Sequence, residues 1–277
     1  MSLSGKKKLN VIKQSGNKKL AGKVMNVNSK NIYYQSKMDK KDLKVKKLIE
    51  DTFIPHPAYG HRRLAIELMM NKKKILRVMK KYDLHPPRLW YSKKFTTRPS
   101  VKYQDEFKNL ITDISNPMVN DIWHCDLTYL KFQKRFFYLS AIQDHISNEI
   151  VSFNLSARHD SFLTLKTIKE AVLKQEAIPN IFHFDRGREN LAEKCIKYLQ
   201  SLGIDISVSD PASPWQNHIE SFFSRFKAES GDMNRFETLE ELIEFIYQYI
   251  NYYNKERIVT RLKTSPVKYR QSQRICS

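Results

Sequence analysis

The pattern of apolar positions divides the chain into a helical front part and a strand-rich back part. Between residues 41 and 84, apolar side chains recur at helical spacing in stripes interrupted at Pro57 and Gly60. Upstream of residue 40 apolar positions are few, so a short pattern from Leu20 to Tyr33 predicts a helix-turn-helix remnant in a partly flexible arm. Residues 86–115, which open on two prolines, are expected to form a basic linker.

From residue 120 the pattern changes to strands. Three β-rich runs at 122–130, 136–142 and 149–155 are separated by turn signals and predict an antiparallel meander. Helices near 161–175 and 190–202 then alternate with strands at 181–184 and 204–208, which predicts a mixed sheet with helices on its faces. Two amphipathic helices follow, beginning near 219 and 239. The predicted class is α/β, a mixed five-stranded sheet behind a small all-helical region.

The distribution of charge supports the same division of the chain into a front and a back part. The chain of 277 residues carries a net charge of +20, and all of the excess lies in residues 1–108, which hold 28 Lys+Arg against 8 Asp+Glu. Residues 109–277 hold 21 of each and are neutral. A basic front part favours binding to a polyanion such as DNA, although a basic surface kept for solubility gives the same count.

Composition excludes several classes of protein. No run of 18 apolar residues occurs and the lysine-rich N-terminus lacks an apolar signal segment, so we expect a cytoplasmic protein without membrane contact. The three cysteines are scattered without a Cys-x-x-Cys pair, which argues against a disulfide framework or a structural zinc site.

Three acidic residues stand out in the back part. Asp126 lies in the middle of a strand expected to be central, where a carboxylate needs a partner or a metal. Asp185 follows the strand at 181–184 directly, and Glu220 lies at the edge of an apolar helical stripe. Together they would suit Mg²⁺, which prefers oxygen ligands. Taken singly, they also fit a hydrogen-bonded core residue, a turn residue and a solvated helix residue.

The motifs around these acids resemble those of a known family. The segments DIWHCDLTYL (121–130), HFDRGREN (183–190) and SPWQNHIESFFSRFKAE (213–229) resemble the DDE transposases of bacterial insertion sequences, specifically the insertion sequence 3 group. The catalytic core of that group is similar to retroviral integrase and has a ribonuclease H-like fold. The resemblance extends to YGHRRL (59–64), which is similar to the helix-turn-helix segment before the core, and covers residues 30–270.

The resemblance implies roles for individual residues. Asp126, Asp185 and Glu220 would form the catalytic, metal-binding triad. His183, from its position beside Asp185, is expected to be a packed or supporting residue and not a metal ligand, and Asn217 is also expected to support the triad without binding the ions. The resemblance and the basic helical pattern together give the expected DNA-contact residues, which are Arg62, Arg63, Lys73, Arg77 and Lys227. Phe184, Glu189 and Gln216 depart from the usual residues of the family, but none of these departures removes a carboxylate.

The resemblance also implies a reaction, cofactors and partners. Two Mg²⁺ ions, for which Mn²⁺ could substitute, would lie about 3.5–4 Å apart and support cleavage at the ends of the element, followed by attack of the 3′-hydroxyl on target DNA. The expected partners are double-stranded DNA at element ends and target, further copies of the chain in a synaptic complex, and the helix-turn-helix protein of an upstream reading frame. We expect association with the bacterial nucleoid.

The predicted organisation is a basic arm at 1–40, a helical DNA-binding region at 41–85, a linker at 86–115 and an integrase-like catalytic core at 116–277. Two other functions remain open. A catalytically inactive relative would bind DNA as a repressor or competitor, and a ribonuclease H-like nuclease would cut DNA without joining it.

Overall fold

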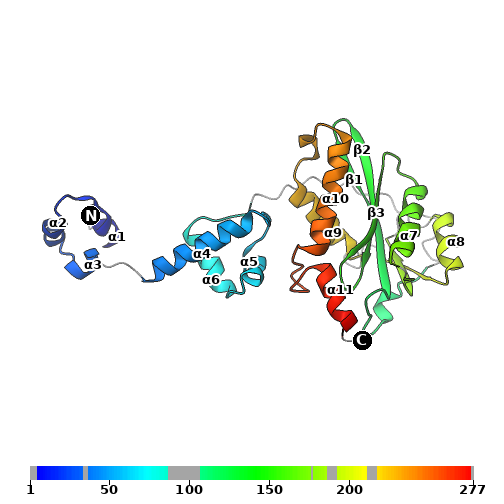
Figure 1. Ribbon diagram of the computed structural model, residues 1–277, viewed down its shortest axis with the longest axis horizontal. Coiled ribbons are helices and arrows are strands. Elements are labelled where there is room, and N and C mark those ends of the chain that lie inside the picture. The colour runs from blue at the N-terminus through cyan, green and yellow to red at the C-terminus, as the bar shows by residue number, and fades with distance from the viewer. Residues whose placement is uncertain are drawn as a thin grey trace.

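The computed structural model describes residues 5–33, 37–86, 107–175, 177–185, 192–210 and 217–275. The front part contains two groups of helices (Figure 1). The first group comprises α1 (Gly5–Gln14), α2 (Lys18–Val24) and α3 (Ser29–Tyr33). The second comprises α4 (Lys37–Phe53), α5 (His61–Glu67) and α6 (Lys72–Lys81).

The first helical group packs on residues other than those the sequence pattern singled out. Leu20 and Val24 are 61% and 79% exposed, whereas Ile12, Gly22 and Ile32 are buried. A Cβ atom on Gly22 would lie 2.3 Å from Cδ1 of Ile32, so this glycine lets α3 approach α2 closely. The short apolar pattern was therefore correct at Ile32 but wrong at Leu20 and Val24, and it missed Gly22 because a glycine carries no hydrophobic signal.

The second helical group has a compact apolar core. The side chains that form it on α4, α5 and α6 are Val45, Ile49, Leu64, Ile75, Val78 and Met79. Asn71 caps α6 by accepting a hydrogen bond of 2.8 Å from the amide of Lys73. The predicted stripes are only partly correct, because Met69 is 95% exposed and Leu48 is 40% exposed.

The back part is a mixed five-stranded sheet. Its strands are β1 (Ile122–Phe132), β2 (Arg135–Asp144), β3 (Ile150–Ser156), β4 (Ile181–Phe184) and β5 (Asp205–Val208). The order is β3-β2-β1-β4-β5, with antiparallel pairs among the first three strands and parallel pairs of β4 with β1 and β5. The meander, the mixed sheet and the central place of β1 are confirmed.

Helices cover both faces of the sheet (Figure 1). On one face lie α7 (Ser161–Gln175) and α8 (Glu193–Ser201), and on the other α9 (Ile219–Ser230) and α10 (Leu239–Lys255). The chain also contains the 3-10 helices η1 (Ile111–Asp113) and η3 (Met233–Arg235), and α11 (Pro266–Ile275). This arrangement is the expected ribonuclease H-like fold. Among the described residues, no helix combines the length and apolar character needed to cross a membrane.

Two expectations about this part change. The apolar spacing predicts a buried stripe on α7 through Phe162, Leu165, Ile168 and Val172. Ile168 is buried as expected, but Phe162 is 68% exposed and the buried face also includes Leu163, Thr167 and Ala171. The last residues of the predicted linker also lie against the sheet, since Val208 donates a hydrogen bond of 3.2 Å to the carbonyl of Lys108.

The α4–α6 group docks on the C-terminal helices of the core. The amide of Ile258 donates a hydrogen bond of 2.7 Å to the hydroxyl of Tyr59, and His56 Nδ1 lies 3.0 Å from the hydroxyl of Tyr252. Arg63 faces Glu229 of α9 at 3.8 Å. Residues of α5 and of the loop before it therefore attach the helical group to the back part of the chain.

Candidate active site

The three acidic residues come from three elements that meet at the centre of the sheet. Asp126 lies on β1, and Asp185 follows the last residue of β4. Because Cys125 pairs with Phe184 in the parallel register, the next residues along both strands are neighbours. Glu220 lies in the first turn of α9, which packs against β1. The fold thus brings these residues, which are widely separated in the sequence, close enough for the charges of Asp185 and Glu220 to act on Asp126.

The pKa of Asp126 reflects the charges of the other two acidic residues. Burial raises the pKa of the Asp126 carboxyl, and the charges of Asp185 and Glu220 raise it further. The amide of Leu127, which donates a hydrogen bond of 2.7 Å to Oδ1, and the charge of Lys227 lower it. The net result is a pKa well above the ordinary value. Clustered carboxylates of this kind are stabilised by a cation, and their oxygen atoms suit Mg²⁺ or Mn²⁺.

Lys227 lies on the same helix as Glu220 and close to β1. Its ammonium group is 4.3 Å from the centre of the Tyr129 ring, and it lowers the pKa of Asp126. A cation held over an aromatic ring beside three carboxylates provides a positive charge at the edge of the acidic cluster. That position would suit a phosphate of bound DNA.

Known proteins resemble this chain in sequence. Two integrase core domain models match residues 116–214 and 220–273. An uncharacterized transposase-like protein of Haemophilus influenzae is 34% identical over 75% of this chain and 96% of its own length. The putative transposase InsK for insertion sequence element IS150 of Escherichia coli is 28% identical over 82% of each chain.

The chain belongs to the integrase-core transposases of bacterial insertion sequences. The family acts in DNA transposition, and its members are polynucleotidyl transferases. Among solved structures, the catalytic core domain of BIV integrase aligns with 57% of this transposase and 98% of that domain, at 18% identity and a TM-score of 0.43.

The two residues expected behind the triad are both buried in this transposase. His183 on β4 lies between two hydroxyl groups, 2.9 Å from Ser207 Oγ and 2.8 Å from Ser209 Oγ. Burial lowers the pKa of His183 to about 3, so the ring is neutral at physiological pH. Asn217 donates from Nδ2 to the carbonyl of Cys125 at 3.4 Å. Asn217 thus holds the backbone next to Asp126, while His183 connects β4 to two serine hydroxyls two positions before Asp185.

The basic residues expected to contact DNA fall into two groups in the transposase. Arg62 and Lys73 are exposed. Arg77 is also exposed, but it forms two hydrogen bonds with the buried Asp42, at 2.6 and 2.7 Å. Arg63 is half-buried and turned toward Glu229. Sequence reasoning could not separate the groups, because the acidic partners lie on other helices.

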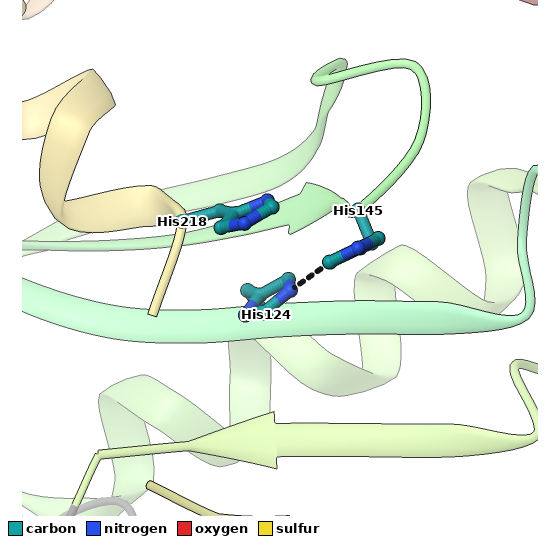
Figure 2. A group of neighbouring side chains, drawn as sticks. All are labelled: His124, His145 and His218. Carbon is teal, nitrogen blue, oxygen red and sulfur yellow. Dashed lines mark hydrogen bonds between the residues drawn. The ribbon is translucent and has the colours of Figure 1, made fainter. Parts of the chain in front are cut away.

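Sequence reasoning also missed a cluster of three histidines beside the acids, His124, His145 and His218 (Figure 2). A signal for it was present, because each acid of the triad follows a histidine by two positions: His124 precedes Asp126, His183 precedes Asp185 and His218 precedes Glu220. On a strand, residues two apart lie on the same face. The carboxylates of β1 and β4 therefore have imidazoles beside them.

Proposed function

We propose that the transposase cleaves DNA at the ends of its insertion sequence and joins the freed 3′-hydroxyl ends to target DNA, with Asp126, Asp185 and Glu220 as the catalytic, metal-binding residues. The supporting observation is the raised pKa of Asp126, to which Asp185 and Glu220 both contribute. The charges of Asp185 and Glu220 both act on Asp126 although residues 109–277 carry no net charge, which supports a role for this local concentration of carboxylates.

Different residues of the chain would bind the metal ions, bind the DNA and position the active site. The three carboxylates would hold Mg²⁺, or Mn²⁺ in its place, and bound ions of this class activate the attacking oxygen and stabilise the leaving oxygen in phosphoryl transfer. Asp126 would be the shared residue, because the charges of both Asp185 and Glu220 act on it. Lys227 would bind a phosphate of the same DNA strand and so orient the scissile bond. His183 and Asn217 position the backbone beneath the carboxylates.

Element-end cleavage and strand joining by the Asp185→Asn variant test this assignment. The substitution removes one charge and changes little in shape, so we expect cleavage to be lost while DNA affinity is kept or increased. Asp205→Asn is a matched control, since Asp205 is exposed on the neighbouring strand β5. Cleavage by Asp185→Asn at the wild-type rate would remove Asp185 from the active site. Loss of activity in both variants would point to a general defect.

We also propose that the basic front part binds the element ends through Arg62 and Lys73, with the α4–α6 group as the DNA-binding unit. Phosphate contacts make the logarithm of the binding constant fall linearly with the logarithm of salt concentration, by about 0.9 for each phosphate neutralised. The double variant Arg62→Ala/Lys73→Ala should therefore flatten the slope by about two units. Lys255→Ala, an exposed change on α10, should not. An unchanged slope in the double variant would exclude these two contacts.

The proposal distinguishes two rival functions. An inactive relative would keep the salt dependence but show no metal-dependent cleavage. A nuclease would cleave but fail to join precut ends to a target. Joining by the wild-type chain with precut ends, together with its loss in Asp185→Asn, is the outcome expected of the transposase.

A further inference from the structure

Three imidazole rings form a cluster next to the carboxylates. His124 comes from β1, His145 follows the end of β2, and His218 precedes α9 (Figure 2). One nitrogen of each ring lies within 4.8 Å of a nitrogen of the other two. The rings are close to parallel, with centroids separated by 4.3 to 5.1 Å. Residues from three separate elements therefore direct nitrogen donors at one small volume.

Neighbouring groups orient these imidazoles. His124 Nε2 is 2.7 Å from His145 Nδ1. His218 hydrogen-bonds to the backbone of His145, and the side chain of Asn217 lies beside the ring of His124. Histidines that bind metals usually give their second ring N–H to a carbonyl group in this way, which fixes the tautomer that leaves the other nitrogen free.

Two buried polar atoms in and beside the cluster also lack hydrogen-bond partners among the described residues. His124 Nδ1 and Asn217 Oδ1 are buried, and within the described part of the chain neither has a hydrogen bond of good geometry. An unsatisfied buried polar atom costs about 1–3 kcal/mol. An ion on Nε2 of His124 would fix the proton on Nδ1, and a small shift would direct that proton to the amide oxygen of Asn217.

We propose that His124, His145 and His218 form a binding site for a divalent transition-metal ion of the zinc class, separate from the carboxylate site. Imidazole nitrogen suits Zn²⁺, Ni²⁺ and Cu²⁺, whereas carboxylate oxygen suits Mg²⁺ and Mn²⁺. With Zn–N distances of about 2.0–2.1 Å, a tetrahedral site needs nitrogen atoms roughly 3.3 Å apart. The pair at 2.7 Å must open slightly and the wider pairs must close, which are movements within the reach of side-chain rotation.

Such an ion would hold three parts of the site together. It would tie β1 and the turn after β2 to the residue two positions before Glu220, and so fix the first turn of α9 relative to Asp126. Arg261 already braces the same turn, since its guanidinium donates to the carbonyls of His145 and Ile146 at 3.1 and 2.7 Å. The histidines are thus positioning residues for the carboxylates.

Titration of the untagged, metal-stripped full chain with Co²⁺ tests the proposal. Cobalt reports its ligands, because tetrahedral coordination with nitrogen donors gives intense visible absorption and octahedral oxygen coordination gives weak absorption. We expect one Co²⁺ per chain with the intense spectrum, displaced by Zn²⁺. His145→Gln and His218→Gln should each weaken binding at least about 100-fold. The exposed His85→Gln is the matched control and should bind as the wild type does.

The outcomes also separate this site from the carboxylates. Asp126→Asn should keep the intense spectrum if the histidines hold the ion, whereas its loss in that variant would place the ion on the carboxylates and overturn the proposal. A weak octahedral spectrum in the wild type, or wild-type binding by both histidine variants, would also overturn it. The Co²⁺ spectrum of the wild-type chain alone shows whether nitrogen or oxygen atoms bind the ion. The proposal can therefore still be tested if a histidine variant fails to fold. Cobalt binding requires no cleavage, so failure of the proposed function would be seen independently.

Discussion

Glu229 is expected to be the most sensitive single position where the α4–α6 group meets the core. Its side chain is 7% exposed and accepts hydrogen bonds of 2.8 Å from both Arg257 Nε and the hydroxyl of Tyr249. Arg257 is 1% exposed, and Arg63 lies 3.8 Å from the same carboxylate. Glu229→Gln would therefore leave a buried guanidinium uncompensated beside a second one.

The magnitude follows from this burial. Breaking one side of a buried ion pair costs about 3–5 kcal/mol, and each kcal/mol lowers the melting temperature of a domain of this size class by roughly 2–4 °C. We expect Glu229→Gln to lose about 3 kcal/mol in urea unfolding and about 10 °C in melting temperature. Hydrogen exchange at the amide of Ile258, which donates to Tyr59, should accelerate as the α4–α6 group detaches.

The direction of the pKa shift of Glu229 determines how its contribution to stability changes with pH. Burial alone would raise the pKa of Glu229, but hydrogen bonds from Arg257 and Tyr249 and the charge of Arg257 outweigh it and hold the pKa below the ordinary value of 4.5. The contribution of Glu229 is therefore fully present above pH 4.5 and is lost as the pH falls through the lower folded-state value. The wild type and Glu229→Gln should converge in stability under acid conditions.

The control is Glu240→Gln, an exposed change in the first turn of α10 that should cost no more than about 0.5 kcal/mol. If Glu229→Gln at neutral pH matched this control in both unfolding and exchange, the carboxylate would not hold the two parts together, and the docking argument would be wrong.

Three further changes have defined outcomes. Asp126→Asn should raise stability in metal-free buffer at pH 7 by at least about 1 kcal/mol, because it removes a carboxyl group whose pKa is raised by burial and neighbouring charges. In thermal melts, Mg²⁺ should reduce the difference in stability between the variant and the wild type. Asp42→Asn should lower the free energy of unfolding in urea by about 1–3 kcal/mol, because Asp42 is buried and hydrogen-bonded to Arg77. This loss should shrink as the pH falls below 3.8, because the hydrogen bond from Arg77 lowers the pKa of Asp42 in the folded state. Gly22→Ala should loosen α1–α3 by about 1–3 kcal/mol, seen as faster amide exchange there and unchanged exchange in the sheet.

The strands were predictable because their signals are local. A run such as 136–142 is apolar, has turn residues at both ends, and became β2 with only small changes at its limits. The limits of α7 were also predictable, but its buried face was only partly so, since Ile168 is buried as expected and Phe162 is not. Thr167 is fully buried there because its hydroxyl donates to the carbonyl of Leu163 at 2.9 Å, so a polar residue lies inside at no cost while Phe162 stays exposed. Counting apolar residues cannot detect that compensation.

The candidate site was predictable to the extent that strand pairing determines it. Placing Asp126 on the central strand and Asp185 after the next parallel strand needs only the strand limits and their order. The partners of Arg63 and Arg77 could not be found in the same way, because they come from the packing of helices distant in sequence; Tyr59 and Ile258, which meet in the same interface, are 199 residues apart. Basic residues in a helical region therefore look alike in sequence, whether they are exposed or paired.

The pairing that aligns the carboxylates also explains why imidazoles lie beside them. His124 pairs with His183 in the parallel register, two positions before Asp126 and Asp185, and the two rings are 5.1 Å apart. Any sheet that brings these aspartates together must bring these histidines together, one step further along the same strands. The carboxylates repel one another and are stabilised by a hard cation, whereas the deeper, neutral imidazoles gain nothing from Mg²⁺. If both proposals hold, the two donor sets select different ions by ligand chemistry alone, and the spacing of two residues on β1 is what keeps them apart.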